Sequence, residues 1–137
     1  MSFKQSIEDG YAKKIPRDEL RARSLIKASQ EAIATAEKIP KSSSTYKTIV
    51  RELYEGFRQY CEALGFLHGY KFSSHEVITF FLDDVLHEKR ISLKFDRYRK
   101  LRNGINYYGD DVAPETVHEA LKEIPQQVHL LSKHLTE

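Results

Sequence analysis

Arg102 and Asn103 are the pair of residues in this chain best suited to chemistry, and Tyr107 follows Asn103 by four positions. An arginine keeps its charge at physiological pH and presents five N–H donors in a planar fork that matches the oxygens of a phosphate group. A tyrosine ring can stack on nucleic-acid bases. These residue types together favour binding of a ligand that carries phosphate.

Basic residues crowd the segment before this pair. Residues 89–102 contain seven of them and one acid, Asp96. Because the formal net charge of the chain is only +2, a prediction of nucleic-acid binding depends on this local cluster. Such a charge run is either a solvated helix face or a strip that contacts phosphates. The basic residues are Lys89, Arg90, Lys94, Arg97, Arg99, Lys100 and Arg102, and the tyrosines near them are Tyr98, Tyr107 and Tyr108.

Helix geometry places Arg102 at the edge of a buried face. At about 100° per residue, Arg99 and Asn106 lie beside it, whereas Tyr107, five residues on, is turned away by about 140°. A half-buried arginine needs a carboxylate or a phosphate as its partner, because a guanidinium cannot discard its charge. Within the chain, a preceding helix offers two carboxylates that could pair with Arg102, Glu52 and Glu55.

The apolar pattern of the chain is helical throughout. Apolar residues recur at steps of three and four between proline and glycine residues, without the alternation typical of strands. The pattern predicts an all-α fold, an antiparallel bundle of four long helices and one short helix, in a single domain over residues 1–137. We expect the long helices at 17–37, 45–67, 92–109 and 114–135.

Local signals refine this bundle. Ser73 followed by Glu76 has the spacing of a capping box and is expected to open the short helix. Pro125 removes a backbone hydrogen bond at a cost of about 3 kcal/mol, so the last helix should be kinked or split there. Tyr54 and Phe66 lie off the main apolar stripe of their helix and would suit an interface between two subunits.

The composition indicates a globular protein. Hydrophobic residues make up 40% of the chain and charged residues 31%, a balance that disordered chains lack. The lone cysteine, Cys61, cannot form an internal disulfide, which suits a reducing compartment. No stretch approaches the roughly 20 apolar residues of a membrane span. We therefore expect a cytoplasmic protein that does not enter a membrane.

The segment 102–109, RNGINYYG, resembles the signature of HEPN domains, small helical-bundle proteins many of which cut RNA. In that signature, Arg-Asn is followed a few residues later by histidine. Shorter similarities extend the resemblance over most of the chain. They are Lys14-Ile15-Pro16, Tyr54-Glu55, Gly69-Tyr70 and Ser74-His75.

The resemblance implies roles for single residues. In catalytically competent HEPN proteins the arginine and the histidine form a metal-independent ribonuclease site, usually between two subunits, where the RNA 2′-hydroxyl attacks the adjacent phosphate. Arg102 would hold that phosphate, Asn103 would support the site, and Tyr107 stands at the histidine position. A tyrosine with a pKa near 10 is ionised in about one molecule in a thousand at pH 7, a handicap of about 4 kcal/mol for a general base. Gly109 stands where many HEPN toxins paired with a minimal nucleotidyltransferase carry a tyrosine.

The six histidines do not replace this base in an obvious way. None follows Arg102 closely, and His75, at the start of the short helix, is expected to be a surface or capping residue. His129 and His134 are five residues apart, whereas metal-binding histidines on one helix face are four apart. We expect no metal and no cofactor.

The sequence thus predicts a homodimeric HEPN-type protein that binds RNA or a nucleotide in a toxin-antitoxin or defence system, with weak or lost ribonuclease activity. One alternative is an active metal-independent endoribonuclease toxin, assisted by Tyr107 or a displaced histidine. Another is a structural module that binds a minimal nucleotidyltransferase. The catalytic residues stay open. The expected RNA- or nucleotide-binding residues are Arg102, Asn103, Asn106, Tyr107 and Arg99, with Glu55 as the candidate supporting carboxylate.

Overall fold

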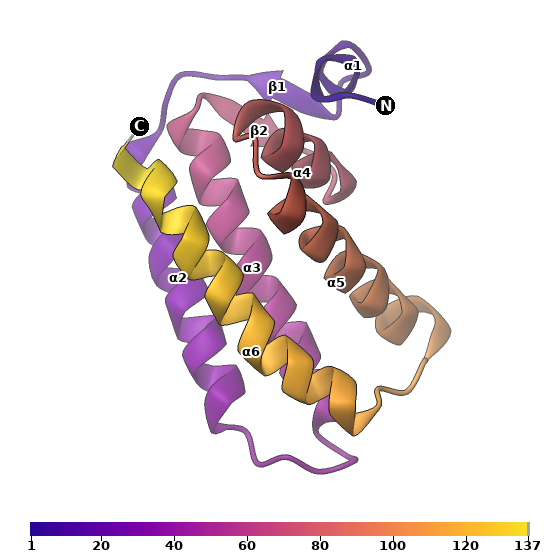
Figure 1. The fold of residues 1–137 in the computed structure, drawn as a ribbon. Coiled ribbons are helices and arrows are strands. Elements are labelled where there is room, and N and C mark those ends of the chain that lie inside the picture. The colour runs from indigo at the N-terminus through magenta and orange to yellow at the C-terminus, as the bar shows by residue number, and fades with distance from the viewer. Residues whose placement is uncertain (137) are drawn as a thin grey trace.

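The structure, a computed structural model, describes residues 1–136 and consists mainly of long helices packed side by side (Figure 1). Within these residues the long helices are α2 (Glu19–Lys38), α3 (Tyr46–Leu67), α5 (Lys89–Tyr108) and α6 (Pro114–Leu131). The short helix α4 (Glu76–Phe80) continues into a π-helical turn, η1 (Phe81–Val85). The predicted all-α bundle is confirmed with its four long helices and this short one, and the N-terminal segment adds a further short helix.

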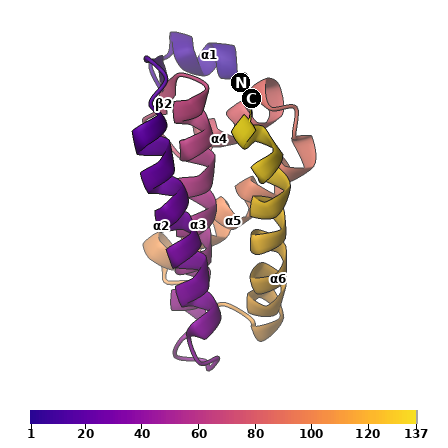
Figure 2. The ribbon, with the colours of Figure 1, turned by 90° about the vertical axis from the view of Figure 1, so that its left-hand side faces the viewer.

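Helix α3 forms the centre of the core, because its apolar side chains recur at steps of three and four and are largely buried. Helix α2 packs closely along one side of it and α6 along another (Figure 2). Gly56 permits the close approach of α2: the Ser29 hydroxyl donates to the Gly56 carbonyl over 2.6 Å. No helix within residues 1–136 has the length and apolar character needed to cross a membrane.

The ends of the long helices follow local chemistry. The side chain of Asp18 accepts a hydrogen bond from a free backbone N–H in the first turn of α2. Gly109 ends α5 with a left-handed φ of 67°, which glycine adopts without steric cost. Pro125 lies inside α6, which stays one helix to Leu131 before the 3-10 turn η2 (Ser132–Thr136). Of the two predicted outcomes the kinked helix therefore holds, and the split does not.

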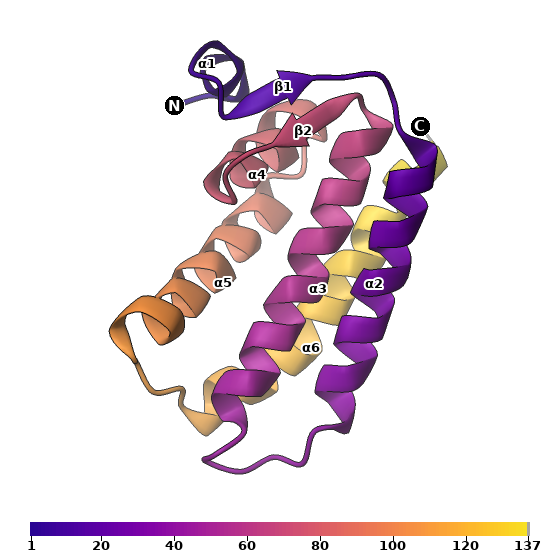
Figure 3. The same cartoon turned by 180° about the vertical axis from the view of Figure 1, so that it is seen from behind.

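The N-terminal segment forms structure that the sequence pattern did not predict. Helix α1 (Phe3–Glu8) and strand β1 (Ala12–Lys14) cross one end of the bundle, and β1 pairs antiparallel with β2 (Tyr70–Phe72) (Figure 3). The register joins Lys13 to Lys71. Strands of three residues are too short for an alternating pattern to reveal them.

Ser73 bonds to the segment that precedes β1 and so takes part in this small sheet rather than in a helix cap. Its backbone N–H donates to the Tyr11 carbonyl over 2.9 Å, and its hydroxyl donates to the same oxygen over 3.0 Å. The predicted capping box of Ser73 with Glu76 is therefore wrong, because Ser73 extends the strand pairing. The Ser74 hydroxyl instead accepts from the Glu76 N–H over 3.2 Å, and His75 is the N-cap residue of α4.

Candidate anion-binding site

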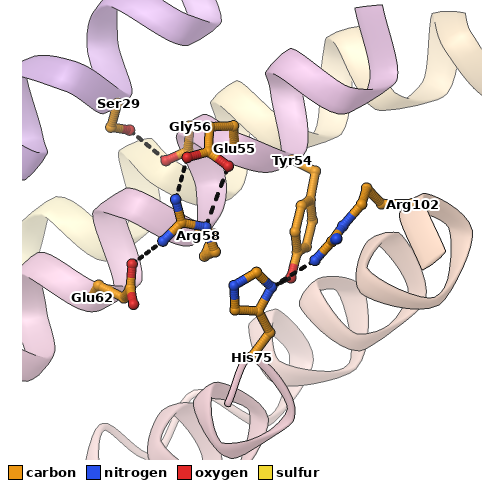
Figure 4. A network of polar contacts seen from close by, with 8 residues as sticks. All are labelled: Ser29, Tyr54, Glu55, Gly56, Arg58, Glu62, His75 and Arg102. Atoms are coloured by element: carbon orange, nitrogen blue, oxygen red, sulfur yellow. Dashed lines mark hydrogen bonds and ion pairs between the residues drawn. The ribbon is translucent and has the colours of Figure 1, made fainter. Parts of the chain in front are cut away.

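Arg102 of α5, His75 at the start of α4 and Tyr54 of α3 meet between the helices (Figure 4). Nη2 of Arg102 donates to Nδ1 of His75 over 2.7 Å, and the Tyr54 hydroxyl lies 3.0 Å from the same nitrogen. The guanidinium carbon of Arg102 lies 4.9 Å from the centroid of the Tyr54 ring, within the range of a cation–π contact. One cation is thus held by two partners, neither of which is a carboxylate.

Both partners of Arg102 are neutral at pH 7. Burial raises the pKa of Tyr54 to about 12, so its hydroxyl stays protonated. Burial, and then the positive charges of Arg58 and Arg102, lower the pKa of His75 to about 4. The charge of Arg102 is therefore not cancelled by the groups that hold it.

Arg102 also has more hydrogen-bond donors than partners. It has five N–H groups: one donates to His75, and the buried Nε has no partner among residues 1–136. Within the same residues no acidic side chain forms an ion pair with Arg102. A half-buried cation without a counter-charge is costly, and a bound anion would offset that cost.

The carboxylate expected to support Arg102 serves another arginine. Glu55 and Glu62 both pair with Arg58, whose Nε lies 3.3 Å from one Glu55 oxygen (Figure 4). Arg58 stands on the same helix as both acids, three and four residues away, which is the spacing of side-chain neighbours. The predicted ion pair between Glu55 and Arg102 is therefore wrong. The charge of Glu55 still acts on the site, because it acts to raise the pKa of His75.

A pocket of about 340 Å³ opens beside Arg102. Its size is at the lower end of the range of roughly 300–1,000 Å³ for small-molecule sites. The loop before α4 supplies one wall, and α5 supplies the other. The lining residues are Ser73, Ser74, His75, Glu76, Arg99, Arg102, Asn103 and Tyr107.

Asn103 and Tyr107 share this pocket with Arg102, as the sequence predicted, whereas Asn106 does not line it. The Asn106 side-chain oxygen accepts a hydrogen bond from Nε of Arg51 over 2.7 Å. Tyr107 reaches the pocket although it is turned away from Arg102, because it lies one turn after Asn103 and helical side chains lean toward the N-terminus. Asn106, which the sequence placed among the binding residues, therefore lies outside this pocket.

Arg99 lines the same pocket but has a counter-charge. Its Nη2 lies 2.7 Å from one oxygen of Asp96, and Nζ of Lys100 lies 3.1 Å from the other. Burial acts to raise the pKa of Asp96, but the hydrogen bonds from Arg99 and Lys100 outweigh it and lower that pKa. Arg99 therefore offers a phosphate less net charge than Arg102 does.

The remaining part of the basic segment is also partly neutralised. Lys94 pairs with Glu123 of α6, and Arg97 pairs with Glu119 and Glu123. Tyr98 is fully buried and donates to Glu123 over 2.6 Å, so its ring is not available for stacking on a base. Much of the predicted phosphate-contacting strip thus ties α5 to α6.

His75 is the site residue that the sequence pattern missed. It lies 27 positions before Arg102, so helix geometry gave no reason to join them. Tyr54, 1% exposed, belongs to the same cluster, and Phe66 is buried as well, beneath the guanidinium of Arg21. The interpretation of Tyr54 and Phe66 as a subunit interface is therefore wrong. The signal that could have found the cluster was the resemblance at Tyr54-Glu55 and Ser74-His75.

The donor set of the pocket suits an anion. Besides the Glu76 carboxylate, the pocket is lined by guanidinium, amide and hydroxyl groups and one neutral imidazole. Across residues 1–136, no three His, Cys, Asp or Glu side chains gather in a group that could hold a metal ion. Burial raises the pKa of the Cys61 thiol well above its usual range, so this cysteine is a poor nucleophile.

Comparison of the chain with protein-family models, with curated proteins and with solved structures gave no match. The resemblance to HEPN domains is therefore carried by the residues and motifs of this chain alone.

Proposed function

We propose that this protein is an HEPN-type protein that binds RNA or a nucleotide through a phosphate group at Arg102. The observation that carries the proposal is a half-buried arginine held by two neutral side chains at the edge of a polar pocket. A phosphate oxygen supplies both the acceptor and the negative charge that this guanidinium lacks.

The neighbours of Arg102 suit a nucleotide better than an isolated inorganic anion. Asn103 and the Ser74 hydroxyl line the same pocket and can bond to phosphate or ribose oxygens. The Tyr107 side chain lines it too, and this residue is 71% exposed. Stacking of a base on such a ring contributes about 1–3 kcal/mol.

Ribonuclease activity is the second candidate, because His75 is a displaced histidine 2.7 Å from Arg102. Attack by a 2′-hydroxyl needs a general base, whose pKa is best placed near the working pH. The pKa of His75, about 4, lies well below that optimum. We therefore rank binding, with weak or lost cleavage, ahead of an active endoribonuclease toxin.

The proposal extends to a cytoplasmic homodimer in a toxin-antitoxin or defence system, with a minimal nucleotidyltransferase as its partner. The segment 102–109 and its resemblance support this part, and the lone buried Cys61 suits a reducing compartment. Light scattering tests the dimer, for which we expect about twice the chain mass of 16.0 kDa.

Titration of labelled single-stranded RNA, and separately of ATP, into the wild type and Arg102→Gln tests phosphate binding. We expect wild-type affinity to fall as salt rises, because phosphate contacts displace counterions. The variant should bind RNA at least about tenfold more weakly, since a charge-assisted hydrogen bond contributes about 1.5–3 kcal/mol. Arg51→Gln is the matched control, because Arg51 is exposed and contacts Asn106 outside the pocket. Absent or salt-insensitive binding contradicts the proposal and favours a module that binds only protein.

Incubation of RNA with the protein in EDTA, followed by analysis for cyclic-phosphate ends, separates the two candidates. We expect no cleavage that depends on Arg102. Cleavage by the wild type that disappears in Arg102→Gln would establish the ribonuclease.

A further inference from the structure

Arg102 is held differently from two other covered arginines of this chain. The side chains of Arg58 and Arg99 are 15% and 14% exposed, and both bond to carboxylates. Arg102 bonds to His75 and lies over Tyr54. A carboxylate fixes a guanidinium and also cancels its charge, whereas a neutral imidazole fixes it and leaves the charge available.

The geometry also determines which nitrogen of His75 carries a proton. A guanidinium donates hydrogen bonds and accepts none, so Nδ1 of His75 must be the unprotonated acceptor of the 2.7 Å bond. In the neutral ring the single proton is therefore on Nε2. Nδ1 is occupied by Arg102, and Nε2 has no free lone pair, so neither nitrogen is ready to take a proton from a substrate.

We infer that His75 is a positioning residue that presents Arg102 to a phosphodiester with its charge intact and takes no part in proton transfer. This inference rests on the proposed phosphate site, and it adds the residue on which the availability of Arg102 depends. It also gives a physical reason for a binding site without cleavage.

The charged groups around His75 favour its neutral form. Arg58 of α3 and Arg102 and Arg99 of α5 act to lower its pKa, and Glu55 of α3 acts to raise it. Burial acts in the same direction as the arginines. If Nδ1 were protonated, its N–H would face an N–H of Arg102 and no hydrogen bond could form between them. The bond that positions the guanidinium therefore requires the neutral ring.

Three substitutions at His75 separate positioning from a merely structural role. His75→Asn keeps a neutral acceptor at the position of Nδ1, His75→Asp puts a charged acceptor there, and His75→Leu removes the acceptor. Asn and Asp both stabilise a helix start, and His75 is the N-cap residue of α4. A structural role therefore predicts that Asn and Asp behave alike and that Leu is the most damaging.

The inference predicts a different order of affinity for a short labelled single-stranded RNA. The Asn variant should bind within about threefold of the wild type, and the Leu variant about tenfold more weakly, because Arg102 is no longer held. The Asp variant should bind most weakly, by more than about tenfold, because its carboxylate takes the place of the phosphate. Equal affinities of the Asn and Asp variants, in proteins that urea unfolding shows to be folded, would overturn the inference.

A measurement on the free protein keeps this test independent of RNA binding. Nitrogen-15 NMR of the wild-type imidazole should show Nδ1 unprotonated and Nε2 protonated from about pH 5.5 to pH 8. A ring that is charged at pH 6, or that carries its proton on Nδ1, contradicts the inference even where RNA binds. Wild-type protein that binds no RNA but shows the expected tautomer would instead refute the proposed function and leave the positioning of Arg102 in place.

Discussion

The guanidinium carbon of Arg102 lies 4.9 Å from the centroid of the Tyr54 ring, so the site arginine rests on an aromatic face. The ring attracts the cation without neutralising it, a contact worth about 0.5–2 kcal/mol depending on desolvation. Tyr54 is buried in α3, at the centre of the core, so the ring that supports Arg102 is itself held by core packing.

Tyr54→Phe should separate the two contacts of this ring. The variant keeps the face under Arg102 and loses the hydroxyl beside His75, so we expect the free energy of unfolding to fall by about 1 kcal/mol. RNA affinity should stay within about threefold, because Arg102 remains on the ring. Urea unfolding and fluorescence anisotropy provide the two readings. A loss of affinity as large as that of Arg102→Gln would show that the hydroxyl, and not the ring, holds the arginine.

The low pKa of His75 predicts a pH dependence of stability. The pKa is about 4 in the folded protein and near 6.5 in an unfolded chain, so below pH 6.5 the unfolded chain binds more protons. The free energy of unfolding should therefore fall as the pH drops from 6.5 toward 4. Since the ring is only half-buried, we expect about 1 kcal/mol from this residue between pH 7 and pH 5.

Urea unfolding of the wild type and His75→Asn at pH 7 and pH 5 measures this contribution. Lowering the pH from 7 to 5 should reduce the free energy of unfolding of the wild type more than that of the variant. Parallel pH profiles would mean that His75 titrates normally in the folded state.

Asp96→Asn should strengthen RNA binding, because Asp96 now neutralises Arg99 at the edge of the pocket. Release of Arg99 adds one cation that can contact a phosphate, so we expect an affinity gain of roughly threefold to tenfold at low salt. The slope of log affinity against log salt should steepen by about 0.7 for one more contact with a single strand. Anisotropy titrations at several salt concentrations measure both quantities.

Glu55→Gln is the matched control for this gain. It also removes a carboxylate that pairs with an arginine, but Arg58 does not line the pocket. Its affinity for RNA should change by less than about threefold. An equal gain from both substitutions would mean that the net charge of the protein, and not the placement of Arg99, governs binding.

Gly56→Ala should destabilise the packing of α2 on α3. A Cβ at this position would lie 2.7 Å from the Ile33 side chain and 3.0 Å from the backbone oxygen of Ser29, so one helix must shift. We expect a loss of about 2 kcal/mol in the free energy of unfolding. RNA affinity at a temperature where the variant is folded should be unchanged, because Gly56 does not line the pocket. Chemical denaturation checks the first expectation, and a large loss of affinity would contradict the second.

The sequence predicted the bundle because the spacing of apolar residues in a long amphipathic helix marks its buried face. It predicted Arg102 as a site residue because a half-buried cation on such a face needs a partner. It did not predict that partner. Helix geometry relates residues within one helix, whereas the contact of Arg102 with His75 joins two elements whose relative rotation depends on the packing of the whole core. The same limit explains Glu55, which pairs with Arg58, three residues away on its own helix.

The pairing of β1 with β2 has a consequence for the order in which this protein folds. Ser73, which extends that pairing, bonds to Tyr11 across 62 positions of the chain, whereas α2 and α3 are consecutive helices joined by a short connection. Closing the long loop costs more chain entropy than closing the short one, so we expect the helical hairpin to form first and the strand ladder late. His75 lies two residues beyond Ser73. The site would then be completed in the final steps of folding, and a chain still lacking its N-terminal ladder would be helical yet unable to capture a phosphate.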